Sequence, residues 1–187
     1  MNRLDLFPTP IVGLHRVVSR QLGDSRGYLA RAFCAEELSA AGWPGPVVQA
    51  NLTYTRQKGT VRGLHFQHPP HAEAKLVRCL RGEIWDVVLD LRKDSPTFLK
   101  WHAEILSPGN MNAFLIPQGC AHGFQSLVDD VEMLYLHSAA HAPASEGGLS
   151  VNDPMLAIEW PLPLGEMSAR DRSFPFLPHD FKGVCRS

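Results

Sequence analysis

Residues 75–91 read Lys75-Leu-Val-Arg-Cys-Leu-Arg-Gly82-Glu-Ile-Trp-Asp-Val-Val-Leu-Asp-Leu91. Side chains that favour β structure fill this stretch on both sides of Arg81-Gly82, and glycine is the residue that most readily turns a chain. The sequence therefore predicts two strands, over 75–80 and 83–91, joined as a β-hairpin at Arg81-Gly82.

Short strands and turns continue outward from this stretch in both directions. Further strands are predicted over 49–55, 101–106, 113–116 and 131–137, with turns at 58–59, 95–97, 107–110 and 117–119. The helical pattern is confined to 34–41, where Gly42 and Pro44 stop it. This density of short strands is typical of an antiparallel sandwich or barrel, so the fold class is predicted as mainly β with a few short helices.

The chain has the length and composition of one ordinary domain. It has 187 residues, of which 44% are hydrophobic and 20% charged, and these values suit a single packed core. We expect one domain over 1–187, with an N-terminal arm over 1–46 and a barrel core over about 47–161. A proline-rich C-terminal segment, 162–187, is expected to wrap the surface with short helical turns.

Charge and cysteine use exclude several classes of protein. Eighteen basic and nineteen acidic side chains give a net charge of -1, so no overall field favours nucleic acid or an anionic membrane. No apolar run approaches the ~20 residues that a membrane span needs. Pro8 and Pro10 break the apolar core that a secretory signal requires, and the four cysteines contain no CxxC pair. We therefore expect a cytoplasmic protein with reduced thiols.

Histidines cluster in the middle of the chain. His65, His68 and His71 lie within seven residues, and His122 is flanked by glycines. Imidazoles bind transition metals well, but Pro69-Pro70 makes convergence of the first three awkward, and no HxH pair has a carboxylate close behind it. We expect no bound metal, with His68 and His71 solvated in a loop.

Three single residues could carry chemistry or could be structural. His65 lies in an alternating strand, where Arg62 is expected to face away from it, and an inward His can simply be a satisfied core residue. Lys75 could be a solvated strand end, and Tyr135 could be a core aromatic with a bonded hydroxyl. Taken singly, none of these residues decides the function.

Ten blocks, in order along nearly the whole chain, together carry a resemblance to a known family. They are GDSRG (23–27), VQAN (48–51), VRGLHFQ (61–67), AKLVR (74–78), DVVLD (86–90), KDSPTF (93–98), IPQG (116–119), AHGF (121–124), NDP (152–154) and IEWP (158–161). The chain resembles the dTDP-4-dehydrorhamnose 3,5-epimerases, which are cupin-type sugar-nucleotide epimerases. The resemblance implies a cupin-like jelly-roll sandwich or barrel, a homodimer and a role in deoxysugar biosynthesis.

The resemblance also implies roles for individual residues. His65 matches the catalytic base of the family, Asp171 its carboxylate partner and Tyr135 its proton donor. Lys75 matches the family's catalytic lysine. Residues that match substrate-binding positions are Gln49, Asn51, Arg62, His122 and, reaching across a dimer interface, Arg26.

The implied reaction explains why these residue types are needed. A 4-keto sugar has acidic protons at C3 and C5, which an oriented histidine removes. Lys75 or an imidazole stabilises the enolate, and Tyr135 returns a proton from the opposite face. The substrate already holds the carbonyl, so we expect no cofactor, and the expected partner is a nucleotide-diphosphate sugar. Two alternatives remain open: a non-catalytic cupin that binds a sugar nucleotide, and a cupin ketoisomerase or metal-dependent enzyme.

The chain departs from the family pattern at six positions. Leu22 stands where the family usually has an aromatic, Arg31 where it has Glu, and Leu136 where it has Lys. Ala140 and His141 replace an aromatic pair, and Val151 replaces Trp. Losing stacking aromatics and reversing a charge is expected to alter which base or sugar is held. The sequence does not say whether C3, C5 or both are inverted.

Overall fold

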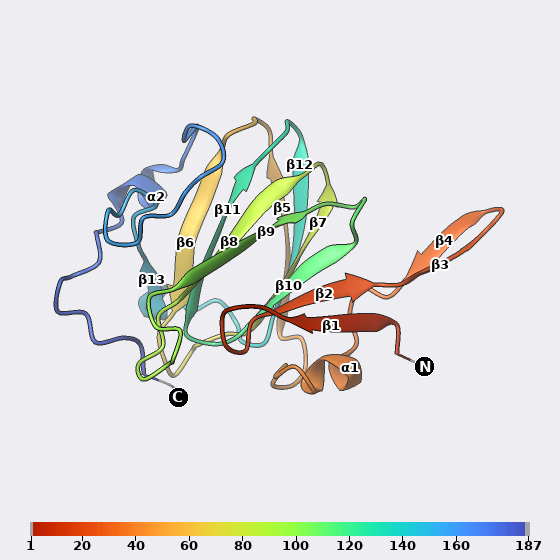
Figure 1. The fold of residues 1–187 in the computed structure, drawn as a ribbon, viewed down its shortest axis with the longest axis horizontal. Helices are drawn as coiled ribbons and strands as arrows, with labels where there is room; N and C mark the ends of the chain where they lie inside the picture. Colours follow the sequence, from red (N-terminus) through yellow and green to blue (C-terminus); the bar gives the residue numbers. More distant parts are fainter. Residues whose placement is uncertain (1, 186–187) are drawn as a thin grey trace.

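The computed structural model describes residues 2–185, whose strands form two main antiparallel sheets and a separate hairpin (Figure 1). In chain order the elements are β1 (Leu4–Pro8), β2 (His15–Ser19), β3 (Gln21–Asp24), β4 (Gly27–Ala30), α1 (Ala35–Ser39), β5 (Gln49–Thr55), β6 (Val61–Gln67), β7 (Lys75–Arg81), β8 (Ile84–Asp90), β9 (Trp101–Leu106), β10 (Asn112–Ile116), β11 (Cys120–Ser126), β12 (Val131–His137), the 3-10 helix η1 (Pro143–Ser145), β13 (Glu146–Gly148) and α2 (Ala169–Ser173). The prediction of a mainly β chain with a few short helices is confirmed.

The strand order is that of a jelly-roll sandwich. One sheet has the order β1-β2-β10-β7-β12-β5, and the other has the order β13-β6-β11-β8-β9. Most neighbours in a sheet are distant in the chain, because the chain repeatedly crosses from one sheet to the other. Residues far apart in sequence therefore meet on the inner faces of the sandwich.

Three apolar clusters hold the layers together. The first lies between the sheets and includes Val77, Phe114 and Phe124. The second covers the outer face of the five-stranded sheet, where the segment from 149 onward packs on it. The third lies where α1 and residues 41–47 cover the outer face of the six-stranded sheet. Because β7 and β8 are covered on both faces, apolar side chains point to both sides of each strand, and neither strand shows a simple alternation.

The predicted hairpin at Arg81-Gly82 is wrong. β7 pairs with β10 and β12, whereas β8 pairs with β9 and β11. Val77 on β7 and Val88 on β8 belong to the same inner cluster, so the two strands face each other across the core. Gly82, with φ 80°, turns the chain from one sheet to the other.

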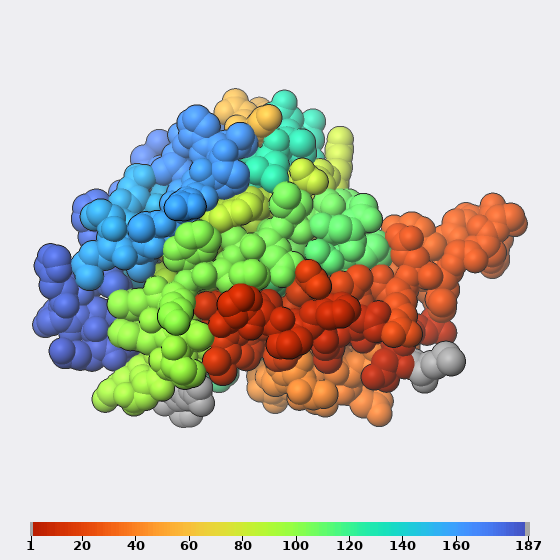
Figure 2. Space-filling model, viewed as in Figure 1, coloured from red at the N-terminus to blue at the C-terminus, as the bar shows by residue number. Residues whose placement is uncertain are grey.

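Two segments extend beyond the sandwich. The β3–β4 hairpin projects from the body (Figures 1 and 2), while the C-terminal segment lies along the five-stranded sheet and carries α2. α1 lies within the predicted helical stretch 34–41. No helix within residues 2–185 is long and apolar enough to cross a membrane.

Candidate active site

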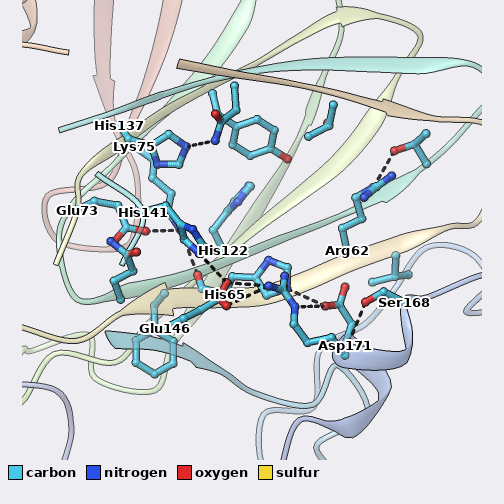
Figure 3. Close-up of a pocket in the computed structure, with 18 of the residues that line it drawn as sticks. Arg62, His65, Glu73, Lys75, His122, His137, His141, Glu146, Ser168 and Asp171 are labelled. Carbon is cyan, nitrogen blue, oxygen red and sulfur yellow. Dashed lines mark hydrogen bonds and ion pairs between the residues drawn. The ribbon is translucent and has the colours of Figure 1, made fainter. Parts of the chain in front are cut away.

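A pocket of about 670 Å³ is lined by residues from both sheets and from the segment that carries α2 (Figure 3). Its volume is within the range of small-molecule sites. Eight of the nine residues predicted for the site line this pocket: His65, Asp171, Tyr135, Lys75, Gln49, Asn51, Arg62 and His122. The topology therefore gathers at one place side chains from five strands and one short helix.

The pairing of β6 with β11 decides which side chains face the pocket. His65 lies opposite His122, and Arg62 lies opposite Phe124, so three steps along β6 match two steps along β11. This irregularity shifts the alternation of β6 by one residue. Arg62 and His65 both line the pocket, and the expectation that they face opposite ways is wrong.

His65 and Asp171 form a close pair. His65 Nε2 lies 2.9 Å from Asp171 Oδ1, and the Asp171 side chain is only 4% exposed. The Gly63 backbone N–H donates to Asp171 Oδ2 at 3.3 Å. Burial alone would raise the pKa of Asp171, but the hydrogen bond with His65 and that from Gly63 outweigh it and lower the pKa. The carboxylate is therefore held charged beside the imidazole.

The helix that carries Asp171 fixes its position. Ser168 is the N-cap of α2, and its hydroxyl accepts from the Asp171 backbone N–H at 3.0 Å. This cap satisfies one of the free N–H groups at the start of the helix. The sequence Ser168-Ala-Arg-Asp171 thus holds the carboxylate at a defined place on a helix of only five residues.

The neighbours of His65 define its tautomer. Arg170 Nη2 lies 3.3 Å from the same Nε2 that contacts Asp171. One ring nitrogen does not accept from a guanidinium while donating to a carboxylate, and the charged contact at 2.9 Å is the stronger one. We assign the proton to Nε2, which leaves a lone pair on Nδ1.

A second histidine–carboxylate pair lies beside the first. His122 Nε2 is 2.8 Å from Asp86 Oδ1, and Asp86 is fully buried. Burial raises the pKa of Asp86, although the charge of His122 opposes this. The His122 ring meets the Tyr135 ring edge-on at 5.9 Å. Burial, and then the charge of Asp86, raise the pKa of Tyr135, so the phenol keeps its proton at neutral pH.

The polar side chains of β5 and β6 extend the pocket. Gln49 Nε2 donates to Asn51 Oδ1 at 3.2 Å. The Arg62 guanidinium donates to Thr55 Oγ1 and to the Tyr54 carbonyl, both at 3.0 Å. These bonds hold amide and guanidinium donors on one wall of the pocket.

Arg26 is the one predicted site residue that lies outside the pocket of its own chain. It is at the tip of the β3–β4 hairpin and pairs with Asp24 at 2.6 Å.

Of the six departures, His141 alone lines the pocket. Leu136 packs in the cluster under α1, and Val151 packs in the cluster on the five-stranded sheet. Arg31 pairs with Glu37, whose carboxylate also accepts from the backbone of Arg3 and Leu4. Leu22 and Ala140 are exposed. Arg31, Leu136 and Val151 therefore lie outside the pocket, and their side chains contact other parts of the protein.

Sequence reasoning missed several pocket residues. Glu73, His137, Glu146 and Arg170 line the pocket as well. Arg170 donates to Glu146 at 2.9 and 3.0 Å, which joins α2 to β13. Only Glu73 gave a sequence signal, because it precedes Lys75 by two residues and so shares its face of an extended chain. Among the described residues, no group of three or more His, Cys, Asp or Glu is arranged to hold a metal ion.

A jelly-roll sandwich whose pocket holds an oriented histidine and a partly buried tyrosine defines a cupin-type isomerase that works by proton transfer. The family described as dTDP-4-dehydrorhamnose 3,5-epimerase matches residues 8–179. The chain belongs to this family, as the resemblance implied.

Relatives and solved structures agree with this assignment. The dTDP-4-dehydrorhamnose 3,5-epimerase of Salmonella typhimurium is 41% identical over 157 residues, which cover 83% of this chain and 85% of that protein. The dTDP-4-dehydrorhamnose 3-epimerase of Streptomyces niveus is 37% identical over 168 residues, covering 89% and 81%. The crystal structure of a dTDP-6-deoxy-D-glucose-3,5-epimerase from Legionella pneumophila, in complex with dTDP-4-keto-L-rhamnose, has a TM-score of 0.89 and 33% identity and covers 98% and 100%.

Proposed function

We propose that His65 and Asp171 carry out the proton abstraction by which this epimerase inverts C3, C5 or both of a nucleotide-linked 4-keto-6-deoxy sugar. The observation that carries the proposal is the 2.9 Å contact between His65 and a buried carboxylate inside a pocket that also holds Lys75 and Tyr135. The carboxylate orients the imidazole and stabilises the imidazolium that forms when it takes the proton.

The remaining pocket residues serve the enolate and its reprotonation. Removing a proton next to the carbonyl places negative charge on the sugar O4. The Lys75 ammonium is the donor that stabilises this charge. His122, whose Nε2 lies 2.8 Å from Asp86 Oδ1, contributes to substrate binding. Tyr135, whose phenol keeps its proton at neutral pH, returns a proton on the face opposite His65. Every step is a proton transfer, so the reaction needs no cofactor.

The nucleotide is held by Gln49, Asn51 and Arg62, together with Arg26 of the partner subunit in a homodimer. The charged side chains that line the pocket balance one another: Arg56, Arg62, Lys75 and Arg170 against Glu73, Glu146, Glu166 and Asp171. A diphosphate is therefore better matched when a further arginine enters the site. The projecting hairpin exposes Leu22, Tyr28 and Leu29 by 49%, 59% and 62%, which suits burial against a second copy.

The choice of substrate is proposed from the relatives. We propose dTDP as the nucleotide, which the names of the similar proteins support. Both a 3,5-epimerase and a 3-epimerase are among them, so the catalytic set alone does not decide how many centres are inverted. His141 is the departure placed to alter substrate preference, since it lines the pocket.

The unit that does this is the whole domain over 1–187, because Asp171 lies on the C-terminal wrap and His65 in the core. We also propose a cytoplasmic location, which agrees with the absence of disulfides at Cys34, Cys79 and Cys185.

Deuterium wash-in from heavy water tests the proposal across several nucleotide-linked 4-keto-6-deoxy sugars, dTDP sugars first. We expect the wild-type protein to exchange protons at C3, C5 or both and His65→Ala to lose at least about 10³-fold of that rate. His68→Ala, which alters an exposed loop histidine outside the pocket, is the matched control. Binding without exchange would instead support a non-catalytic cupin, and turnover that requires added Fe²⁺ or Ni²⁺ would support a metal-dependent enzyme.

A further inference from the structure

The Lys75 ammonium is held at the pocket by two protein acceptors. Its side chain is only 8% exposed, and Nζ lies 2.9 Å from Glu73 Oε1. Nζ also donates to the His65 carbonyl oxygen at 3.2 Å. An ammonium has three N–H donors, so these contacts leave one donor for a ligand in the pocket that Lys75 lines (Figure 3).

Glu73 is an unusual residue to find in this position. Its side chain is 5% exposed, and Oε2 is buried with no hydrogen-bond partner among the described residues. Burying a carboxylate is costly, and apolar residues of similar volume often replace a buried ion pair with no loss of stability. The pair is therefore poorly explained by stability alone.

The contacts of Lys75 with Glu73 and with the His65 carbonyl fix the orientation of its ammonium. Lysine has a long, flexible side chain, and holding its ammonium in one orientation requires strong acceptors. A charged acceptor at 2.9 Å on one side and a backbone carbonyl on the other restrict Nζ to one position. A donor fixed in this way stabilises a developing oxyanion without reorganising during the reaction.

We propose that Glu73 is a positioning residue that fixes the Lys75 ammonium so that its third N–H meets the carbonyl oxygen of the sugar as negative charge develops there. This inference rests on the proposed function of the site. Glu73 acts through Lys75 and does not itself contact the substrate.

A double-mutant cycle on the full-length protein tests the proposal, with proton exchange and epimerisation of the same dTDP-linked 4-keto sugar as readouts. We expect Glu73→Ala to lower kcat by about 10–100-fold while KM changes less than about twofold, because the donor acts mainly in the transition state. Glu73→Gln retains an acceptor oxygen, so it recovers part of the lost kcat. In a Lys75→Ala background, Glu73→Ala has no further effect on kcat.

Two further measurements separate positioning from a structural role. Glu132→Ala removes a carboxylate from an exposed pair with Arg81 at 3.8 Å, outside the pocket, and leaves kcat unchanged. In thermal unfolding, we expect the double variant Glu73→Ala/Lys75→Met to recover the stability that Glu73→Ala loses, while its kcat stays low.

Several outcomes would overturn the proposal. They are a wild-type kcat in Glu73→Ala, effects of Glu73→Ala and Lys75→Ala that multiply, and a kcat that recovers together with the melting temperature. A wild-type protein that exchanges no proton with any of the sugars overturns the proposed function, and the role of Glu73 falls with it. Wild-type exchange together with an unaffected Glu73→Ala variant overturns the role of Glu73 alone.

Discussion

At the scale of single residues, the roles proposed for His65 and Tyr135 separate proton removal from proton return. Tyr135→Phe deletes only the phenolic oxygen of a partly buried side chain. We expect this variant to keep deuterium exchange, because His65 returns a proton to the face from which it took one. Inversion falls by about 10²-fold or more, since the general acid on the opposite face is gone. Exchange and inversion are followed separately by NMR in heavy water.

Tyr54→Phe is the matched control for this experiment. Tyr54 is on the neighbouring strand, β5, and its hydroxyl bonds to Asp130 on the protein surface. Tyr54→Phe should leave the rates of deuterium exchange and of inversion unchanged. Equal loss of exchange and inversion in Tyr135→Phe, at an unchanged melting temperature, would mean that Tyr135 binds substrate or steadies the enolate.

His137 makes the stability of the protein depend on pH. Burial, and then the charges of Lys75, His122 and His141, lower its pKa to about 4 from an ordinary 6.5. Between these values the unfolded chain binds a proton that the folded chain does not, so stability falls as the pH falls from about 6.5 to 4. Because His137 is partly exposed, we expect a loss of about 1–2 kcal/mol.

The contribution of His137 is isolated by comparing urea unfolding of the wild type and His137→Asn between pH 7 and pH 4. The raised pKa of Asp86 acts in the opposite direction, but it is present in both proteins and cancels in the difference. His71→Asn, at an exposed loop position, should behave as the wild type does. Parallel pH curves for the wild type and His137→Asn would contradict the prediction.

At the scale of elements, the contact between β6 and β11 sets the geometry of the site. A Cβ added at Gly123 would lie 2.9 Å from the Arg62 carbonyl oxygen and 2.9 Å from Leu64 Cδ2. Gly123→Ala must therefore push β6 away, and we expect a loss of about 2 kcal/mol or more in the free energy of unfolding. Because β6 carries both Arg62 and His65, kcat/KM should fall by about 10²-fold.

Gly109→Ala, at a turn position, is the control for replacing a glycine with alanine. Its added Cβ would meet only Ser107 Oγ, at an ordinary 3.7 Å, so stability and turnover should stay close to wild type. If Gly123→Ala retained wild-type turnover, the close approach of the two strands would have no part in positioning the site.

The elements also show how far the sequence alone could predict this protein. Strands such as 75–81 and 131–137 were readable because their side chains favour β structure. The sheet to which a strand belongs could not be predicted in this way. β7 and β8, for example, are covered on both faces, so their sequences show no alternation. The direction of the Arg62 side chain depends on a register shift between β6 and β11. Such a shift is a property of the pair of strands, so it could not be predicted from β6 alone.

The same distinction applies to the site. The resemblance identified His65, Asp171 and Lys75, whereas the roles of Glu73 and Arg170 follow from the tertiary contacts that place them against those residues. A carboxylate two positions before a lysine is usually a solvated surface pair. Burial is what gives it a different role here.

At the scale of the whole molecule, the projecting β3–β4 hairpin predicts an assembly that shares its sites. Arg26→Ala removes a side chain that is 87% exposed in a single chain. We expect light scattering to report a dimer for both the wild type and the variant. The variant's KM for a dTDP sugar should rise by about 10-fold, because a charge-assisted contact with the diphosphate is lost.

Arg20→Ala provides the comparison, since Arg20 also forms an exposed ion pair, with Asp5 at 2.5 Å, close to the base of the hairpin. Its KM should stay at the wild-type value. A wild-type protein that is monomeric at micromolar concentration, or a KM that Arg26→Ala leaves unchanged, would rule out this shared site.

The position of Asp171 on the C-terminal wrap has a consequence for how the protein is made. Asp171 follows His65 by 106 residues, so at about 5–20 residues per second the ribosome adds it about 5–20 s later. All strands from β7 to β13 are synthesised in that interval, while the outer face of the five-stranded sheet still awaits its cover. A nascent chain therefore has the strands of the pocket wall before it has the segment that completes the pocket. The contact between His65 and Asp171 can form only once the segment that covers the five-stranded sheet has been synthesised.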